Sequence, residues 1–98
     1  MRAIHKYTLE VGDTTLKIKA GAKVLALQVQ RRQVVLWALV DPDRLDHEIW
    51  VVRCYGTGQP LLPDELDGLE FLGTAQLANG DFVGHFFVMS RYAETLPR

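Results

Sequence analysis

The chain has 98 residues, of which 48% are hydrophobic and 23% charged, with a formal net charge of −1 and a pI of about 6.3. This length predicts one domain over residues 1–98 with a modest core, and the apolar share excludes a disordered chain. The near-neutral charge disfavours nucleic-acid binding, because such proteins usually carry a basic patch.

No apolar stretch approaches the ~20 residues that a membrane helix needs, so we expect no membrane partner. The chain opens into an alternating segment rather than a signal peptide, which predicts a cytoplasmic protein. Its single cysteine, Cys54, agrees with a reducing compartment because it cannot form an internal disulfide.

Two alternating segments begin the chain, at residues 2–11 and 14–19. Gly12 is the first of the two residues between them, which suits a type II′ turn. The sequence therefore predicts a hairpin, in which Thr8 would lie beside Lys17.

Residues 23–30 and 33–40 predict a central hairpin, to which the other segments are added. The second arm is apolar on both faces, so it is expected inside a sheet or at an interface. A loop of two or four residues would set Leu27 beside Leu36, whereas a three-residue loop would set Leu27 beside Trp37. Without Gly or Asn in the loop, both registers stay open.

Alternation in the first arm assigns Leu25, Leu27 and Val29 to one face and Val24 to the opposite one. Residues 20–22 form a short connector from the preceding segments, so the first four strands are expected to form a meander.

Pro42 ends the fourth strand, because proline cannot continue a ladder of hydrogen bonds. Residues 48–55 resume the strand pattern, again with apolar groups on both faces. Residues 56–68, GTGQPLLPDELDG, are the least regular part of the chain. A connection this long in a small domain is either functional or mobile.

The last hairpin has the strongest local signal, because Asn79-Gly80 between alternating runs is typical of a type I′ turn. Its register places Thr74 beside His85 and assigns Phe71 to the core face. Residues 90–98 are predicted to be a short tail with one helical turn.

About seven strands without a long helix predict an all-β fold, a small antiparallel β-sandwich or flattened barrel with hairpin connections. No helix is then left to cover the second face of the double-faced strands. The apolar groups left over are Trp37, Leu39, Phe87 and Met89. They indicate a homo-oligomer, most simply a symmetric dimer.

The sequence lacks the residue patterns of an enzyme or a metal site. Its histidines and cysteine, His5, His47, His85 and Cys54, have no metal-ligand spacing, and Ser90 is its only serine. Paired carboxylates occur only in loops, where solvated turn residues explain them. We therefore expect no catalytic residue, no metal and no cofactor.

The candidate ligand-binding residues combine cations, aromatic rings and a glycine turn, and they are Arg31, Arg32, Trp37, Arg53, Tyr55, Gly56 and His85. Backbone N–H groups of the turn and the guanidinium groups could hold a phosphate, while a ring stacks on a base. Except for Arg53, each also has a plain structural explanation: a strand-ending turn, an exposed hairpin tip, core packing or a surface pair.

Several short motifs, spread in order over nearly the whole chain, carry a family resemblance. They are Ile4-His5-Lys6-Tyr7, Val29-Gln30, Leu36-Trp37-Ala38-Leu39-Val40-Asp41, Tyr55-Gly56-Thr57-Gly58, Leu72-Gly73-Thr74 and His85-Phe86-Phe87. With them the chain resembles a family of short uncharacterised proteins encoded by tailed bacteriophages and prophages, although it is longer than the family pattern between Gly58 and Leu72. The resemblance implies a phage accessory protein in the bacterial host cytoplasm.

From these observations we expect a non-enzymatic accessory binding protein that interferes with a host process. It would sequester a small anionic or nucleotide-like ligand or block a host protein. The alternative is a structural or assembly protein of the virion, whose double-faced strands pack against other subunits.

Overall fold

The computed structural model describes residues 1–95, and within them the chain forms seven β-strands and one short 3₁₀ turn, with no α-helix. Nor does this part contain any helix that could cross a membrane. The strands are β1 (Ala3–Leu9), β2 (Asp13–Lys19), β3 (Lys23–Gln30), β4 (Gln33–Val40), β5 (His47–Gly56), β6 (Glu70–Leu77) and β7 (Phe82–Ala93). The predicted all-β class is confirmed.

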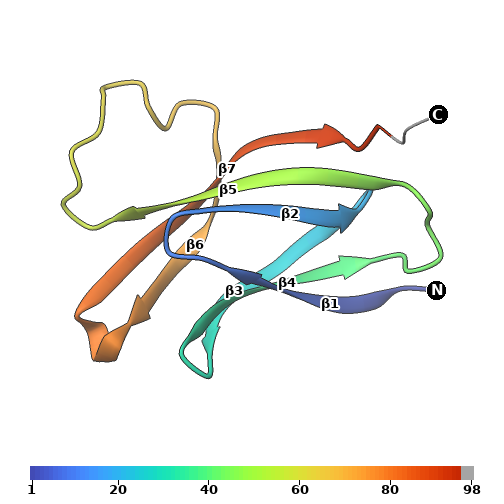
Figure 1. The fold of residues 1–98 in the computed structure, drawn as a ribbon, viewed down its shortest axis with the longest axis horizontal. Coiled ribbons are helices and arrows are strands. Elements are labelled where there is room, and N and C mark those ends of the chain that lie inside the picture. The colour runs from blue at the N-terminus through green and yellow to red at the C-terminus, as the bar shows by residue number, and fades with distance from the viewer. Residues whose placement is uncertain (96–98) are drawn as a thin grey trace.

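The strands form two antiparallel sheets, β1-β4-β3 and β2-β5-β7-β6, stacked as an open sandwich (Figure 1). The extents of the molecule, 43 × 32 × 20 Å, fit a flat body two sheets thick. β4 and β5, whose sequences are apolar on both faces, each lie between two neighbouring strands, as their patterns predict.

The core lies between the sheets, and every strand except β3 contributes buried side chains to it. These are Leu9, Leu16, Ile18, Val34, Leu36, Ala38, Val40, Trp50, Val52, Ala75, Phe86 and Val88. Along each strand they alternate with outward-facing residues, as expected where one face of a sheet packs on another.

The predicted hairpin of β1 with β2 is wrong, because these strands belong to different sheets. β1 pairs with β4, so Thr8 lies opposite Val35, and β2 pairs with β5, so Lys17 lies opposite Ile49. The chain crosses between the sheets at Gly12, which has a φ of +154°. Placing the apolar faces of β1 and β2 in opposite sheets lets the two faces cover each other, which a hairpin cannot do.

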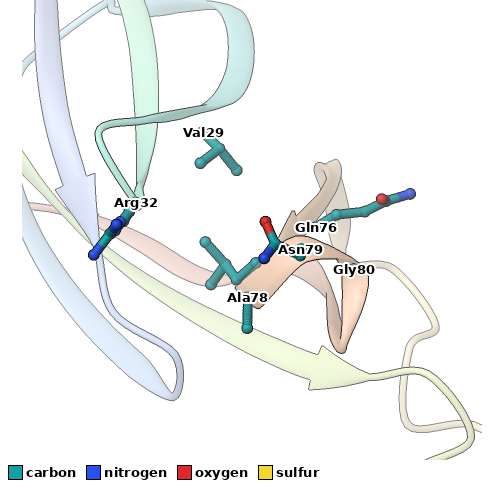
Figure 2. A pocket seen from close by; sticks show the side chains of 7 residues that line it. Val29, Arg32, Gln76, Ala78, Asn79 and Gly80 are labelled. Carbon is teal, nitrogen blue, oxygen red and sulfur yellow. The ribbon is translucent and has the colours of Figure 1, made fainter.

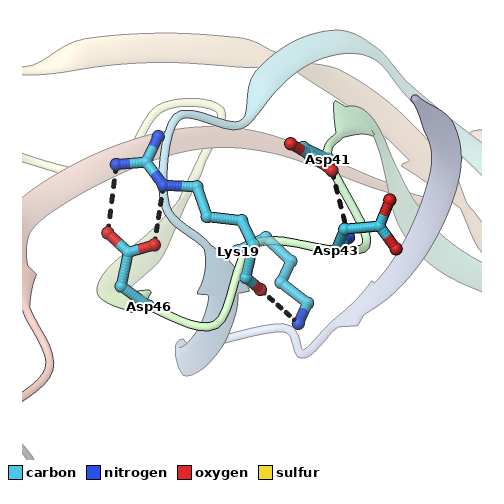
Figure 3. Close-up of polar contacts among 5 residues, drawn as sticks. Lys19, Asp41, Asp43 and Asp46 are labelled. Atoms are coloured by element: carbon cyan, nitrogen blue, oxygen red, sulfur yellow. Dashed lines mark hydrogen bonds and ion pairs between the residues drawn. The ribbon is translucent and has the colours of Figure 1, made fainter. Parts of the chain in front are cut away.

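The predicted meander is wrong for the same reason: of the first four strands, only β3 and β4 form a hairpin. The chain changes sheet again at residues 20–22 and at residues 41–46. Polar contacts fix the last of these crossings (Figure 3). Lys19 Nζ donates to the Arg44 carbonyl at 2.7 Å, and the Arg44 guanidinium donates to both Asp46 carboxylate oxygens at 2.6 and 3.0 Å.

The central hairpin takes the register in which Leu27 lies opposite Leu36. Its two-residue turn consists of Arg31 and Arg32, which have φ values of +51° and +68°. The prediction that Val24 lies on the face opposite Leu27 is wrong, because both side chains pack against the core. A β-bulge at Leu25 shifts the register, and Val24 packs against the core.

The last hairpin has its predicted register, with Thr74 opposite His85, but its connection is longer than the predicted two-residue turn. β6 ends at Leu77 and β7 begins at Phe82, and the 3₁₀ turn Ala78–Gly80 lies between them. Ala78, Asn79 and Gly80 all have positive φ, and the Asp81 N–H donates to the Ala78 carbonyl at 3.1 Å.

A second bulge, between Phe71 and Gly73, contradicts the assignment of Phe71 to the core face. Phe71 lies opposite Phe87 on the outer face. Gly73 has a φ of +150°, and a Cβ there would lie 3.2 Å from the Leu27 Cβ. The close approach of β3 therefore favours glycine at the bulge, and the bulge turns Phe71 outward.

β7 continues farther than predicted, because residues 90–93 pair with β5 instead of forming a tail. In this extension the Arg91 guanidinium lies over the Trp50 ring, 3.7 Å from its centroid, and pairs with Glu70. The guanidinium thus covers one face of the Trp50 ring, which is fully buried. The predicted helical turn before Pro97 falls partly on residues 96–98, outside the described residues.

The long connection at residues 57–69 is explained by the sheet order. β5 and β6 are both antiparallel to β7 and therefore parallel to each other, with β7 between them. Gly56 ends β5 opposite Gly84, whereas Glu70 starts β6 opposite Val88. The chain must cross β7 to reach its next strand, and parallel strands need a crossover of this length.

Candidate functional site

Three aromatic rings form a row on the outer face of the four-stranded sheet, next to residues 57–69. The Tyr55 and Phe87 rings meet edge to face with centroids 5.7 Å apart, and the Phe71 and Phe87 centroids are 5.1 Å apart. Tyr55 is 3% exposed although it points away from the main core, whereas Phe71 is 55% exposed. The row therefore runs from a covered ring to an open one.

His85 lies beside this row, and both of its ring nitrogens have a threonine partner. Its Nε2 is 2.7 Å from Thr57 Oγ1 on the crossover loop, and its Nδ1 is 2.9 Å from Thr74 Oγ1 on β6. A neutral imidazole has one donor and one acceptor nitrogen, so one hydroxyl donates to the ring and the other accepts from it. The two contacts hold the ring in one orientation.

The three rings, His85 and Thr57 line a cleft of about 270 Å³. The lining residues are Tyr55, Gly56, Thr57, Gly58, Gln59, Leu61, Leu66, Phe71, His85 and Phe87. Two backbone donors of the glycine turn are used within the protein. The Gly56 N–H donates to Gln59 Oε1 at 3.0 Å, and the Thr57 N–H donates to the Val83 carbonyl at 3.2 Å. The cleft is thus mainly apolar, with a polar edge made by side chains.

Arg53 lies two residues before Tyr55 and is held by Asp13 of β2. Its guanidinium donates to both carboxylate oxygens, at 2.8 and 3.0 Å. This paired hydrogen bond raises the pKa of Arg53 and lowers the pKa of Asp13. The charge of Arg53 is therefore balanced beside the cleft.

The other three candidate residues lie on the three-stranded sheet. Arg31 and Arg32 form the exposed tip of the central hairpin, and Trp37 lies on the outer face, where its Nε1 donates to Gln28 Oε1 at 3.1 Å. The structure brings Tyr55, Gly56 and His85 together, with Arg53 beside them, and places Arg31, Arg32 and Trp37 elsewhere.

Sequence reasoning missed Phe71, Thr57 and the leucines of the crossover loop as parts of this site. The Asn-Gly turn fixes the register that brings Thr74 to His85, so that pair was readable from the sequence. No local pattern links Thr57 to His85, because the loop reaches the histidine only through the order of the strands.

Within residues 1–95, no group of three or more histidine, cysteine or acidic side chains is placed to hold a metal ion. Burial raises the pKa of the Cys54 thiol, which keeps it protonated at neutral pH and lowers its nucleophilicity.

The fold and the cleft define an open antiparallel β-sandwich with a small aromatic cleft on one outer face. Residues 1–96 match a family described as a domain of unknown function, DUF7352, and the chain belongs to that family. Neither a curated protein nor a solved structure matches it.

Proposed function

We propose that the protein is a non-enzymatic ligand-binding protein whose aromatic cleft holds a planar heteroaromatic ring of the nucleobase type. The observation that carries this proposal is the open side of the Phe71 ring at the end of the aromatic row, beside a polar edge made by Thr57 and His85. Bases are commonly bound by stacking on an aromatic side chain and by hydrogen bonds to their edges.

The polar edge suits such a ring. A threonine hydroxyl has one donor and two acceptor positions, and the contact of Thr57 with His85 uses only one of them. Thr57 therefore keeps donor or acceptor capacity for a base edge. Thr74 does not line the cleft, and its contact with His85 Nδ1 holds the histidine ring in place.

The size and charge of the cleft favour the ring over a phosphate. Its volume of about 270 Å³ is slightly below the range of small-molecule sites, which span roughly 300–1,000 Å³. The nearby Arg53 guanidinium is already paired with Asp13. Among nucleotide-like ligands, we expect bases and nucleosides to bind at least as well as nucleotides.

Thermal-shift measurements with a panel of bases, nucleosides and nucleotides test the proposal, because a ligand that binds the folded state raises the melting temperature. Phe71→Ala should abolish the shift. Tyr92→Ala is the matched control, since Tyr92 is 54% exposed on the same sheet, outside the cleft. The proposal is wrong if no compound raises the melting temperature, or if Phe71→Ala keeps the full shift.

The resemblance to phage-encoded proteins supports a setting in the bacterial host cytoplasm, where binding would remove a small signal or block a host protein. A virion role is the second candidate, and the exposed Ile4 beside Trp37 and Leu39 on the three-stranded sheet favours it. Mass spectrometry of purified particles separates the two, because only an assembly protein should be present in them.

A further inference from the structure

A second cleft, of about 620 Å³, lies between the tips of the β3–β4 and β6–β7 hairpins. Figure 2 shows Val29 and Arg32 on one hairpin, with Ala78, Asn79 and Gly80 on the other. Gln76 and Leu77 complete its lining. It shares no lining residue with the aromatic cleft, so it is a separate site.

This second cleft has a positive charge that nothing in its lining balances. Arg32 is its only charged lining residue. Within residues 1–95, the cations in ion pairs are Lys17, Arg44, Arg53 and Arg91, so the guanidinium groups of Arg31 and Arg32 are both outside these pairs. An exposed guanidinium beside an apolar surface attracts oxyanions, which it can bind through two parallel hydrogen bonds.

The residues of the turn itself point to a use for the arginines. Arg31 and Arg32 both adopt left-handed backbone conformations, which cost a residue with a Cβ roughly 1–2 kcal/mol. The facing tip also holds one such residue, Ala78, with a φ of +52°, but its central pair Asn79-Gly80 adopts this geometry readily. An Asn-Gly pair would therefore form the Arg31-Arg32 turn at lower cost, so the turn itself does not require the arginines.

We infer that the cleft between the hairpin tips binds the oxyanion of a small organic acid or phosphate ester. Arg32 donates to the oxyanion from one hairpin, and the Asn79 side-chain amide donates from the other. The apolar part of the ligand packs on Val29 and Leu77, which give the cleft its apolar surface.

The test is an NMR titration of ¹⁵N-labelled full-length protein at low salt with hexanoate, butyl phosphate and inorganic phosphate. Saturable shifts are expected at Val29, Arg32 and residues 76–80. Binding of hexanoate alone assigns a carboxylate ligand, and binding of both phosphates assigns a phosphate. Preference for butyl phosphate over inorganic phosphate shows that the apolar surface contributes. The absence of saturable shifts with all three compounds overturns the inference.

Two single variants distinguish binding in the cleft from general electrostatic attraction of an anion to the arginines at the hairpin tip. Arg32→Gln should weaken binding by about tenfold or more, because a hydrogen bond to a charged group is lost. Arg31→Gln makes the same charge change in the same turn, but Arg31 does not line the cleft, so affinity should change by less than about threefold. Equal losses in the two variants contradict the inference.

The double variant Arg31→Asn/Arg32→Gly gives a second readout. It should raise the melting temperature, because it relieves the turn, and abolish oxyanion binding. Unchanged binding in this variant also overturns the inference. Nucleoside binding in the aromatic cleft should be unaffected by this double variant. A negative binding result for one cleft therefore does not contradict the proposal for the other.

Discussion

At the scale of single residues, Gly84 is the glycine of the four-stranded sheet with the least room for a side chain. A Cβ at Gly84 would lie 2.5 Å from the Cys54 Sγ and 3.1 and 3.3 Å from the Phe82 and Phe86 rings. Gly56 lies directly opposite Gly84, but a Cβ there would meet its nearest neighbour at an ordinary 3.7 Å. The two glycines are therefore a matched pair with different packing.

We expect Gly84→Ala to reduce the free energy of unfolding by about 1–3 kcal/mol, because the added methyl overpacks the core. Gly56→Ala should have a clearly smaller effect, and Cys54→Ala should restore part of the loss in the double variant. Urea denaturation measures all three. Equal losses at the two glycines would contradict this packing account.

The ion pair of Arg53 and Asp13 predicts a pH dependence of stability. Hydrogen bonds from Arg53 lower the pKa of Asp13 in the folded state below its ordinary value of 3.8. The pair therefore stabilises the fold above that pH, and its contribution is lost as the pH falls through the lowered pKa. With side chains 42% and 53% exposed, it contributes at most about 1 kcal/mol.

Asp13→Asn should therefore lower stability slightly at neutral pH and lose less stability than the parent protein as the pH falls below 3.8. Arg53→Gln should also weaken the dependence of stability on pH in this range, because it removes the same contact. Urea midpoints measured along a pH series check both variants. A parent-like acid slope in Asp13→Asn would show that the carboxyl is not held by the arginine.

At the scale of elements, the pairing of β1 with β4 distinguishes the sandwich from a simple meander. Ile4 lies opposite Leu39 on an outer face, whereas a β1–β2 hairpin would set Thr8 opposite Lys17. Side chains of directly opposed residues are close enough for an engineered disulfide.

In a Cys54→Ala background, Ile4→Cys/Leu39→Cys should form an intramolecular disulfide under mild oxidation, and Thr8→Cys/Lys17→Cys should not. Gel mobility with and without reductant gives the answer. If Thr8→Cys/Lys17→Cys formed the disulfide and Ile4→Cys/Leu39→Cys did not, β1 would pair with β2, which would contradict the sheet order.

The sequence predicts local pairing well and long-range pairing poorly, for a physical reason. The register of β6 with β7 follows from Asn79-Gly80, and the double-faced pattern of β4 predicts its central place. Alternation in β1 and β2 is the same whether the strands pair in one sheet or face each other across a core.

The same limit applies to the candidate site. Tyr55, Gly56 and His85 are recognisable from strand patterns, but Phe71 reaches the cleft only because of a bulge that the close approach of Leu27 to Gly73 favours. That approach is a contact between sheets, which no local pattern encodes.

At the scale of the whole molecule, the three-stranded sheet leaves an apolar outer face. Ile4 is 62% exposed, and Trp37 and Leu39 beside it are half-buried. We expect this face to pair with a second copy, because exposed apolar clusters often mark interfaces.

Light scattering should give a mass near twice the 11.1 kDa of one chain. Ile4→Lys should shift the equilibrium to monomer, whereas Leu45→Lys should not, since Leu45 is exposed in the connection between β4 and β5. If the parent protein stays monomeric at all concentrations measured, the prediction of a dimer is wrong.

The most direct test of the binding account is an NMR titration of ¹⁵N-labelled protein with adenosine and with uridine. The account predicts saturable shifts at residues 55–59, Phe71, Thr74 and residues 85–87, with the hairpin tips unchanged. The absence of shifts with both nucleosides, or shifts gathered around Trp37 on the opposite sheet, would contradict it.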